Sequence, residues 1–287
     1  MSLVRDALIV AGGRGTRMFP ASLAVAKETL PLYDVPLMTH LILEAKAAGI
    51  RRIHFILSPE KSIEGTLTNH DDLHVVRQDL SRVLFSPLQD CEIFIHIQHQ
   101  PKGLGDALAT ALHEIEGPML ILLGDNALLD FHASAREFQA SQVSKKLVDH
   151  FHAHQVSTVG LVEVEREDVS KYGIVQLEGH AIRSIVEKPP IDQAPSRLAL
   201  CGRYVFSEDL QELLKLYDYE SYGELQSIAV QEHWMNQGAL HGVPFSDVQW
   251  YDSGSPLTWL QAQIDHVLRR EDTADEFRAW LEKRLED

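Results

Sequence analysis

The segment ALIVAGGRGTR, residues 7–17, guides the interpretation of the whole chain. Its first five residues are apolar, with branched side chains in the middle, which predicts a strand buried on both faces. Three glycines follow, and residues without a Cβ let the backbone turn sharply and bring its N–H groups close to an anion. Arg14, Arg17 and Lys27 add positive charge to the same region. We therefore predict a phosphate-binding loop, the alternative being an ordinary tight turn with a surface arginine.

Two common phosphate-binding loops are excluded by the spacing of these residues. A dinucleotide-binding fingerprint needs G-x-G-x-x-G, and Met18 occupies the position of its third glycine. A P-loop needs a lysine directly after its last glycine, and Thr16 stands there instead. The loop is therefore of a different kind.

The composition limits the possible partners. The chain has 287 residues, of which 45% are hydrophobic, enough for a large core. Its 26 Lys and Arg against 42 Asp and Glu give a net charge of −16, which argues against binding to nucleic acid or to anionic membranes. Cys91 and Cys201 indicate neither a disulfide framework nor a zinc site. Without a secretory signal or an apolar run of about 20 residues, we expect a cytoplasmic protein.

The first half of the chain alternates between strand and helix patterns. Strands are predicted at residues 52–58, 91–98 and 118–124, and helices at residues 36–48 and 103–115. Because the main strands are apolar on both faces, this order predicts an α/β fold with a mainly parallel sheet. Ligands of such sheets bind beyond the carboxyl ends of strands, where the glycine loop and Asp125 both lie.

The second half is richer in strands, which are predicted at residues 157–164, 172–177, 181–186 and 198–206. Before them, residues 130–155 predict a polar helix, on which His150 and His154 could share a face and bind a metal ion. A solvated helix end is the alternative for these histidines.

The end of the chain predicts a helix with one apolar stripe, formed by Phe277, Trp280, Leu281 and Leu285. This stripe predicts a homo-oligomer, unless it closes the core of its own chain. The sequence contains no internal repeat and no clear linker, so we expect one domain over residues 1–287.

Eight motifs then occur in a fixed order along nearly the whole chain. They are GGRGTR followed by KETLP (12–17 and 27–31), QHQPKGLG (98–105), LGDN (123–126), DVSKYGIV (168–175), VEKP (186–189), GRYVF (202–206), GELQ (223–226) and YDSGS (251–255). In this order the chain resembles the sugar-1-phosphate nucleotidylyltransferases. It is most similar to the bacterial UTP–glucose-1-phosphate uridylyltransferases, because the K-E, D-V-S-K-Y-G, G-R-Y-V and Y-D-S-G-S motifs lean toward that branch rather than the thymidylyl branch.

The resemblance implies a Rossmann-like three-layer nucleotidyltransferase fold. The nucleotide-binding part would span about residues 1–130, and the sugar-binding and metal-completing part about residues 131–287. The implied reaction transfers a uridylyl group from UTP to glucose 1-phosphate by Mg²⁺-dependent in-line displacement, giving UDP-glucose and pyrophosphate. The alternatives are another sugar 1-phosphate or dTTP as substrate, and a non-catalytic regulatory paralogue that binds nucleotide sugars.

This chemistry brings two anions together, so positioning and electrostatics dominate it. Mg²⁺ needs hard oxygen ligands, and the family's metal-binding positions correspond to Asp125 and Asp252, although each aspartate could instead form only an Asx turn. Arg17 and Lys27 match the cations that bind the triphosphate, and Lys188 matches the cation that binds the sugar phosphate. The implied substrate-binding residues are Ala11, Gly12, Gly13, Gly15, Thr16, Gln98, Gly103, Asn126, Gly173 and Glu187.

Gln98 would contact the base through its side-chain amide, and Gly103 would do so through its backbone. Glu187 would hold sugar hydroxyls, and Gly173 would contact the sugar by its backbone.

The chain also departs from the family's pattern at four positions. Leu23 and Val35 stand where the family usually has lysines. Ala26, directly before Lys27, stands where proline or serine is usual, and Ala229 stands where an aspartate is usual. These losses predict altered substrate choice, lower activity or loss of catalysis.

Overall fold

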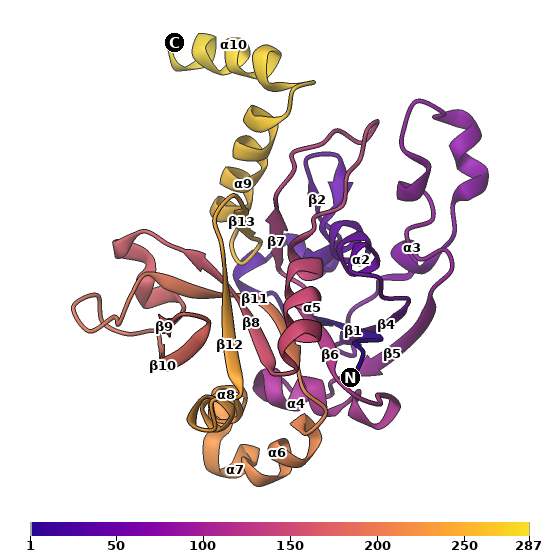
Figure 1. Ribbon diagram of the computed structural model, residues 1–287. Helices are drawn as coiled ribbons and strands as arrows, with labels where there is room; N and C mark the ends of the chain where they lie inside the picture. The colour runs from indigo at the N-terminus through magenta and orange to yellow at the C-terminus, as the bar shows by residue number, and fades with distance from the viewer. Residues whose placement is uncertain (1, 287) are drawn as a thin grey trace.

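The computed structural model describes residues 2–286, and within them nine strands form one central sheet (Figure 1). In spatial order these strands are β5 (Glu92–Ile97), β4 (Arg52–Leu57), β1 (Asp6–Ala11), β6 (Met119–Leu123), β11 (Leu198–Phe206), β8 (Ser157–Glu163), β12 (Leu240–Phe245), β10 (Ala181–Glu187) and β9 (Gly173–Glu178). Two small ladders pair β13 (Gln249–Asp252) with β7 (Asn126–Leu129), and β2 (Pro31–Leu32) with β3 (Val35–Pro36).

The helices lie mostly between the strands along the chain. The α-helices are α1 (Ala21–Ala24), α2 (Leu37–Ala47), α3 (Glu64–Leu67), α4 (Gly103–Ala109), α5 (Val143–His154), α6 (Leu210–Leu216), α7 (Tyr219–Tyr222), α8 (Gln226–Asn236), α9 (Pro256–Arg269) and α10 (Ala274–Leu285). The short 3-10 helices are η1 (Thr16–Met18), η2 (Lys27–Thr29), η3 (Asp71–Val76), η4 (Arg82–Leu84), η5 (Leu112–Glu114), η6 (Arg166–Lys171) and η7 (Gly223–Leu225).

Apolar side chains on both faces of β1 explain why this strand is central. Successive side chains of a strand point to opposite faces. Ile9 packs in one buried cluster with residues of α2 and α5, whereas Leu8 packs in another with residues of α4, α6 and α8. The predicted α/β fold is confirmed. The predicted strand at residues 7–11 and helix at 36–48 are also confirmed, as β1 and α2.

The sheet is parallel from β5 to β6, as predicted, but is mixed from β6 to β9. The pairs β5–β4, β4–β1, β1–β6 and β8–β12 are parallel, but β6–β11, β11–β8, β12–β10 and β10–β9 are antiparallel. The prediction was wrong for β11, which is antiparallel to both of its neighbours and is buried along nearly its whole length. A strand covered on both faces has the same apolar pattern in either direction.

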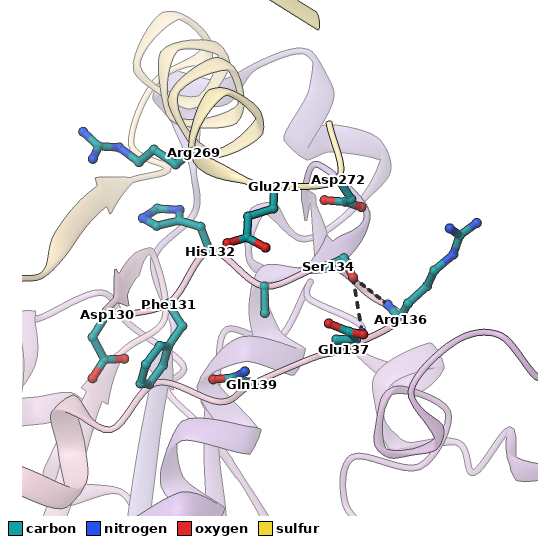
Figure 2. Close-up of a pocket in the computed structure, with 11 residues that line it drawn as sticks. Asp130, Phe131, His132, Ser134, Arg136, Glu137, Gln139, Arg269, Glu271 and Asp272 are labelled. Atoms are coloured by element: carbon teal, nitrogen blue, oxygen red, sulfur yellow. Dashed lines mark hydrogen bonds between the residues drawn. The ribbon is translucent and has the colours of Figure 1, made fainter. Parts of the chain in front are cut away.

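The helix predicted at residues 130–155 begins only at Val143. The side chain of Asp130 accepts a hydrogen bond from the Gln142 N–H, which closes the intervening residues into a loop. Within this loop the Ser134 hydroxyl accepts the N–H groups of Arg136 and Glu137 (Figure 2). Such side-chain bonds compete with helix formation, which the polar pattern alone did not reveal.

None of the helices within residues 2–286 is both long enough and apolar enough to span a membrane. The carboxyl ends of the parallel strands β1, β4, β5 and β6 lie at one edge of the sheet. The glycine loop, Ser58, Gln98 and Asp125 follow these ends directly, so the sheet brings four distant segments together.

Candidate active site

The glycine loop begins where β1 ends and is shaped by two of its glycines. Gly15 has a φ of +64°, in the left-handed region that side chains disfavour. A Cβ on Gly12 would lie 2.6 Å from the Gln98 Oε1 atom, so a side chain at this position would displace the amide. The loop predicted from the sequence therefore lies beside Gln98, the residue expected to contact the base.

Gln98 is buried, and its amide has a defined orientation. Its Nε2 atom donates to Asp106 Oδ2 at 2.8 Å and to the Gly103 carbonyl at 3.2 Å. The Oε1 atom therefore faces Gly12. Gly103, which has a φ of +87°, starts α4 next to this amide. The structure thus brings the two predicted base-contacting residues together.

Lys27 and Asp125 form an ion pair behind the loop. The Lys27 Nζ atom lies 2.7 Å from Asp125 Oδ2, and the lysine side chain is only 7% exposed. η2, which begins at Lys27, holds the lysine in this position. The predicted cation and the predicted metal ligand are therefore direct neighbours, although 98 residues separate them.

The two predicted metal ligands lie on neighbouring chain segments. In the β7–β13 ladder Asp252 pairs with Asn126, and the Ser253 N–H donates to the Asp125 carbonyl at 2.9 Å. Asp252 also accepts the Gly254 N–H at 2.7 Å, so an Asx turn does form and orients this carboxylate. Burial raises the pKa of Asp252, and the charge of Asp125 raises it further.

This arrangement fits a hard divalent cation. Two carboxylates that repel one another supply oxygen ligands of the kind Mg²⁺ prefers. Within residues 2–286, no group of three or more His, Cys, Asp or Glu side chains is arranged to hold a metal ion. A metal bound here would therefore need further oxygen ligands, such as phosphates and waters.

Five further predicted residues line one cavity of about 370 Å³ with these aspartates, whereas residues 11–16 of the glycine loop, Gln98, Gly103 and Lys27 are not part of its lining. The cavity is bordered by Arg17, Asn126, Gly173, Glu187 and Lys188, as well as by Asp125 and Asp252. Glu187 pairs with Gly173 across the β9–β10 hairpin, and the Lys188 Nζ atom lies 3.2 Å from Glu187 Oε1. The structure thus places the Glu187 carboxylate and the Lys188 ammonium side by side at the cavity that Arg17 also lines.

Three residues at this site were missed by the sequence analysis. Lys61 is mostly buried and donates to the Ala11 carbonyl and to Glu28, each at 2.6 Å. Burial lowers the pKa of Lys61 and raises that of Glu28. Tyr172 and Trp250 line the same cavity as Glu187. The signals were weak, since Tyr172 lies inside the D-V-S-K-Y-G motif and Trp250 only two residues before Asp252.

His150 and His154 lie elsewhere, at the end of α5. His150 Nε2 and His241 Nδ1 are 3.0 Å apart, and the His180 ring is 4.8 Å from the His150 ring. Burial lowers the pKa of His150 to about 4, helped by the neighbouring histidines. The two histidines do share a helix face, packed against two further histidines.

A second cavity, of about 630 Å³, lies between the 130–139 loop and the junction of α9 and α10 (Figure 2). The side chains of Arg136 and Arg269 extend outward from it. None of the residues that line this second cavity is among the predicted site residues. Seven of the predicted site residues line the smaller cavity instead.

The site and its α/β scaffold define a class of protein that the comparison with known families confirms. The family model described as Nucleotidyl transferase matches residues 6–267, so the chain belongs to this family. The chain is similar to UTP–glucose-1-phosphate uridylyltransferase 2 of Streptococcus pyogenes serotype M3, at 29% identity over 98% of this chain and 96% of the relative.

Solved structures agree with this similarity. A UDP-glucose pyrophosphorylase from Acinetobacter baumannii superposes with a TM-score of 0.79 at 25% identity, covering 98% of this chain and 99% of that one. A UDP-glucose pyrophosphorylase complexed with UDP-glucose superposes with a TM-score of 0.77 at 27% identity, covering 92% and 98%.

Proposed function

We propose that this chain transfers a uridylyl group from UTP to glucose 1-phosphate, giving UDP-glucose and pyrophosphate. The observation that carries this proposal is the cavity in which Arg17, Asp125 and Asp252 lie together with Glu187 and Lys188. The names of the streptococcal relative and of the solved neighbours support the same reaction.

In the proposed reaction a phosphate oxygen of the sugar attacks the α-phosphorus of UTP in line. The new phosphorus–oxygen bond forms as the bond to pyrophosphate breaks. Arg17 and Lys27 bind the triphosphate oxygens, Lys188 binds the sugar phosphate, and Glu187 holds sugar hydroxyls. These fixed charges stabilise the negative charge that spreads over the transferred group, and the chemistry needs no protein nucleophile.

We assign Mg²⁺ as the metal and Asp125 and Asp252 as the residues that hold it. When bound, the ion would neutralise phosphate charge and polarise the phosphorus–oxygen bonds. The close approach of the two carboxylates, and the raised pKa of Asp252, support this assignment. The Asn126 amide and the Lys27 ammonium fix the orientation of Asp125.

The base-binding end is assigned to Gln98, Gly103 and the glycine loop, with Ala11, Gly12, Gly13, Gly15 and Thr16 surrounding the nucleotide. Because the Nε2 atom of Gln98 is engaged by Asp106 and Gly103, its Oε1 atom is the group that meets the base. An imide N–H donates to such an oxygen. Uracil and thymine both carry an imide, so the amide alone does not separate UTP from dTTP.

We expect UTP to exceed dTTP in kcat/KM with glucose 1-phosphate. The measurement is pyrophosphate release over a panel of nucleoside triphosphates and sugar 1-phosphates with Mg²⁺ present. A kcat/KM for dTTP at or above that for UTP would move the chain to the thymidylyl branch. A higher kcat/KM with another sugar 1-phosphate would change the assigned sugar substrate. If no pair of substrates released pyrophosphate, the result would favour the non-catalytic regulatory paralogue.

The departures from the family pattern lie at different distances from the site. Leu23 is 70% exposed and borders a hollow with Arg14, Lys27 and Lys61. Val35 and Ala229 are buried and do not line the proposed substrate cavity. The cations Arg17, Lys27 and Lys188 are retained, which supports catalysis. Among these departures, Leu23 is the one that shares a hollow with Arg14 of the glycine loop.

We further propose that residues 1–287 are one domain of the Rossmann-like three-layer kind, with the nucleotide held by about residues 1–130 and the sugar by about residues 131–287. The shared sheet supports a single domain, since β11 of the second part pairs with β6 of the first. A cytoplasmic location is proposed because Cys91 and Cys201 are both free thiols.

We also propose that two copies of the chain associate through α10. This helix projects from the body of the molecule (Figure 1), and none of its described residues is buried. Phe277 stacks on Trp280, whose side chain is 51% exposed, and Leu285 is 78% exposed. The stripe thus stays outside the core of its own chain. Light scattering at micromolar concentration should give at least a dimer mass, which Trp280→Glu should reduce; a monomeric wild type would contradict this proposal.

A further inference from the structure

The side-chain amide of Asn126 connects Asp125 to a tryptophan. Trp250 Nε1 donates to Asn126 Oδ1 at 2.7 Å, and Asn126 Nδ2 donates to Asp125 Oδ1 at 3.0 Å. The three residues form a continuous chain of hydrogen bonds from the wall of the substrate cavity to the proposed metal ligand. Asn126 itself is only 7% exposed.

The β7–β13 ladder explains why these side chains meet. Leu128 pairs with Trp250 and Asn126 pairs with Asp252, so Asn126 and Trp250 are diagonal neighbours on one face of the ladder. Diagonal neighbours in an antiparallel pair lie within reach of a long or aromatic side chain. The same ladder therefore sets both the position of Asp252 and the contact that Trp250 makes with Asn126.

Hydrogen-bond chemistry determines which way the Asn126 amide points. An indole N–H can only donate, so the amide oxygen must face Trp250. An ionised carboxylate can only accept, so the amide nitrogen must face Asp125. Without the indole N–H, the amide would keep only its bond to the carboxylate and could rotate away from the position that Trp250 sets. The tryptophan thus fixes the amide, and the amide fixes the carboxylate.

We propose that Trp250 is a positioning residue that acts through Asn126 to hold Asp125 in the orientation the reaction uses. Its indole ring also packs on Tyr172, with ring centres 4.5 Å apart, and both rings line the cavity that contains Glu187. The sugar end of the cavity is thereby connected to the proposed metal ligand. This inference rests on the proposed function for its kinetic consequence, but the hydrogen-bonded chain itself can be tested in the free protein.

The test compares two tryptophan variants that lose the same kind of bond. Trp250→Phe keeps a ring against Tyr172 but removes the N–H. Trp234→Phe is the control, because Trp234 on α8 donates its Nε1–H to the Asp209 carboxylate at 3.0 Å and does not line the substrate cavity. With the substrate pair that the wild type uses, we expect Trp250→Phe to lower kcat about tenfold, the scale of one lost hydrogen bond, with KM changed less than kcat. Trp234→Phe should leave kcat unchanged.

A spectroscopic measurement examines the amide without substrate or metal. The chain contains only three asparagines, Asn69, Asn126 and Asn236, so selective ¹⁵N labelling gives three side-chain amide signals. Trp250→Phe should shift the Asn126 signal and speed the exchange of its protons with water, whereas Trp234→Phe should leave this signal in place. The Asn69 signal serves as the internal reference in both variants, because Asn236 lies only two residues after Trp234.

The outcomes separate this proposal from the proposed function. An unmoved Asn126 signal, or an unchanged kcat in Trp250→Phe with the signal moved, would overturn the positioning role. An equal loss of kcat in Trp250→Phe and Trp234→Phe would show a general structural effect, and it would also overturn the positioning role. A moved Asn126 signal in a protein that releases no pyrophosphate would refute the proposed function and keep the hydrogen-bonded chain.

Discussion

Replacing either Asp125 or Asp252 with asparagine is expected to lower kcat by at least about a hundredfold, the scale on which one electrostatic contact to a transition state acts. Asparagine keeps the size of the side chain but removes the charge that would hold Mg²⁺. Because both carboxylates would serve one ion, the double variant should cost much less than the product of the two single effects. Pyrophosphate release at saturating substrate and Mg²⁺ measures the effect.

The two variants are expected to differ in stability. Asp252→Asn removes a charge that burial and the Asp125 carboxylate both disfavour, as the raised pKa of Asp252 shows, so the fold should be retained. Asp125→Asn instead leaves the mostly buried Lys27 ammonium without its partner, which should lower the free energy of unfolding. Asp218→Asn is the matched control, because Asp218 accepts a backbone N–H in an exposed turn. Turnover close to wild type in either single variant would remove that aspartate from the site.

The second large effect is expected from a buried ion pair behind the site. Arg203 donates to both carboxylate oxygens of Glu44 at 2.9 Å, and the two side chains are 0% and 2% exposed. Glu44 also accepts from Ser144 at 2.5 Å, and Arg203 donates to the Asn126 carbonyl at 2.8 Å. Glu44→Leu leaves the guanidinium buried without a counter-charge. We expect the free energy of unfolding to fall by about 3–5 kcal/mol.

A double variant makes this prediction specific to charge. Glu44→Leu with Arg203→Met should recover most of the lost stability, because an apolar pair of similar volume replaces the two ions. Lys145→Ala is the control, since Lys145 and Asp149 form an exposed pair on α5 whose loss should cost less than about 1 kcal/mol. Urea denaturation of the three variants and the wild type measures the differences. If Glu44→Leu and Lys145→Ala lost equal free energies of unfolding, the result would contradict our argument that burial makes the unpaired Arg203 charge costly.

Much of the scaffold could be predicted because its signals are local. The apolar run before the glycines gave β1, the helical spacing before Gly49 gave α2, and the run at residues 118–124 gave β6. The sites at the strand ends followed, because parallel strands deliver their carboxyl ends to one edge. The ordered motifs then led to the family that the comparison confirmed.

By itself, then, the sequence determined the α/β class, the glycine loop and the set of charged residues placed after the strands, since each depends on neighbours along the chain. Only the tertiary structure decided the direction of β11, the start of α5 at Val143 and the partners of the buried charges. Arg203 and Glu44 are 159 residues apart, and Trp250 and Asn126 are 124 apart. Such pairs leave no periodic signal, because their meeting depends on how the whole sheet is ordered and not on any local pattern.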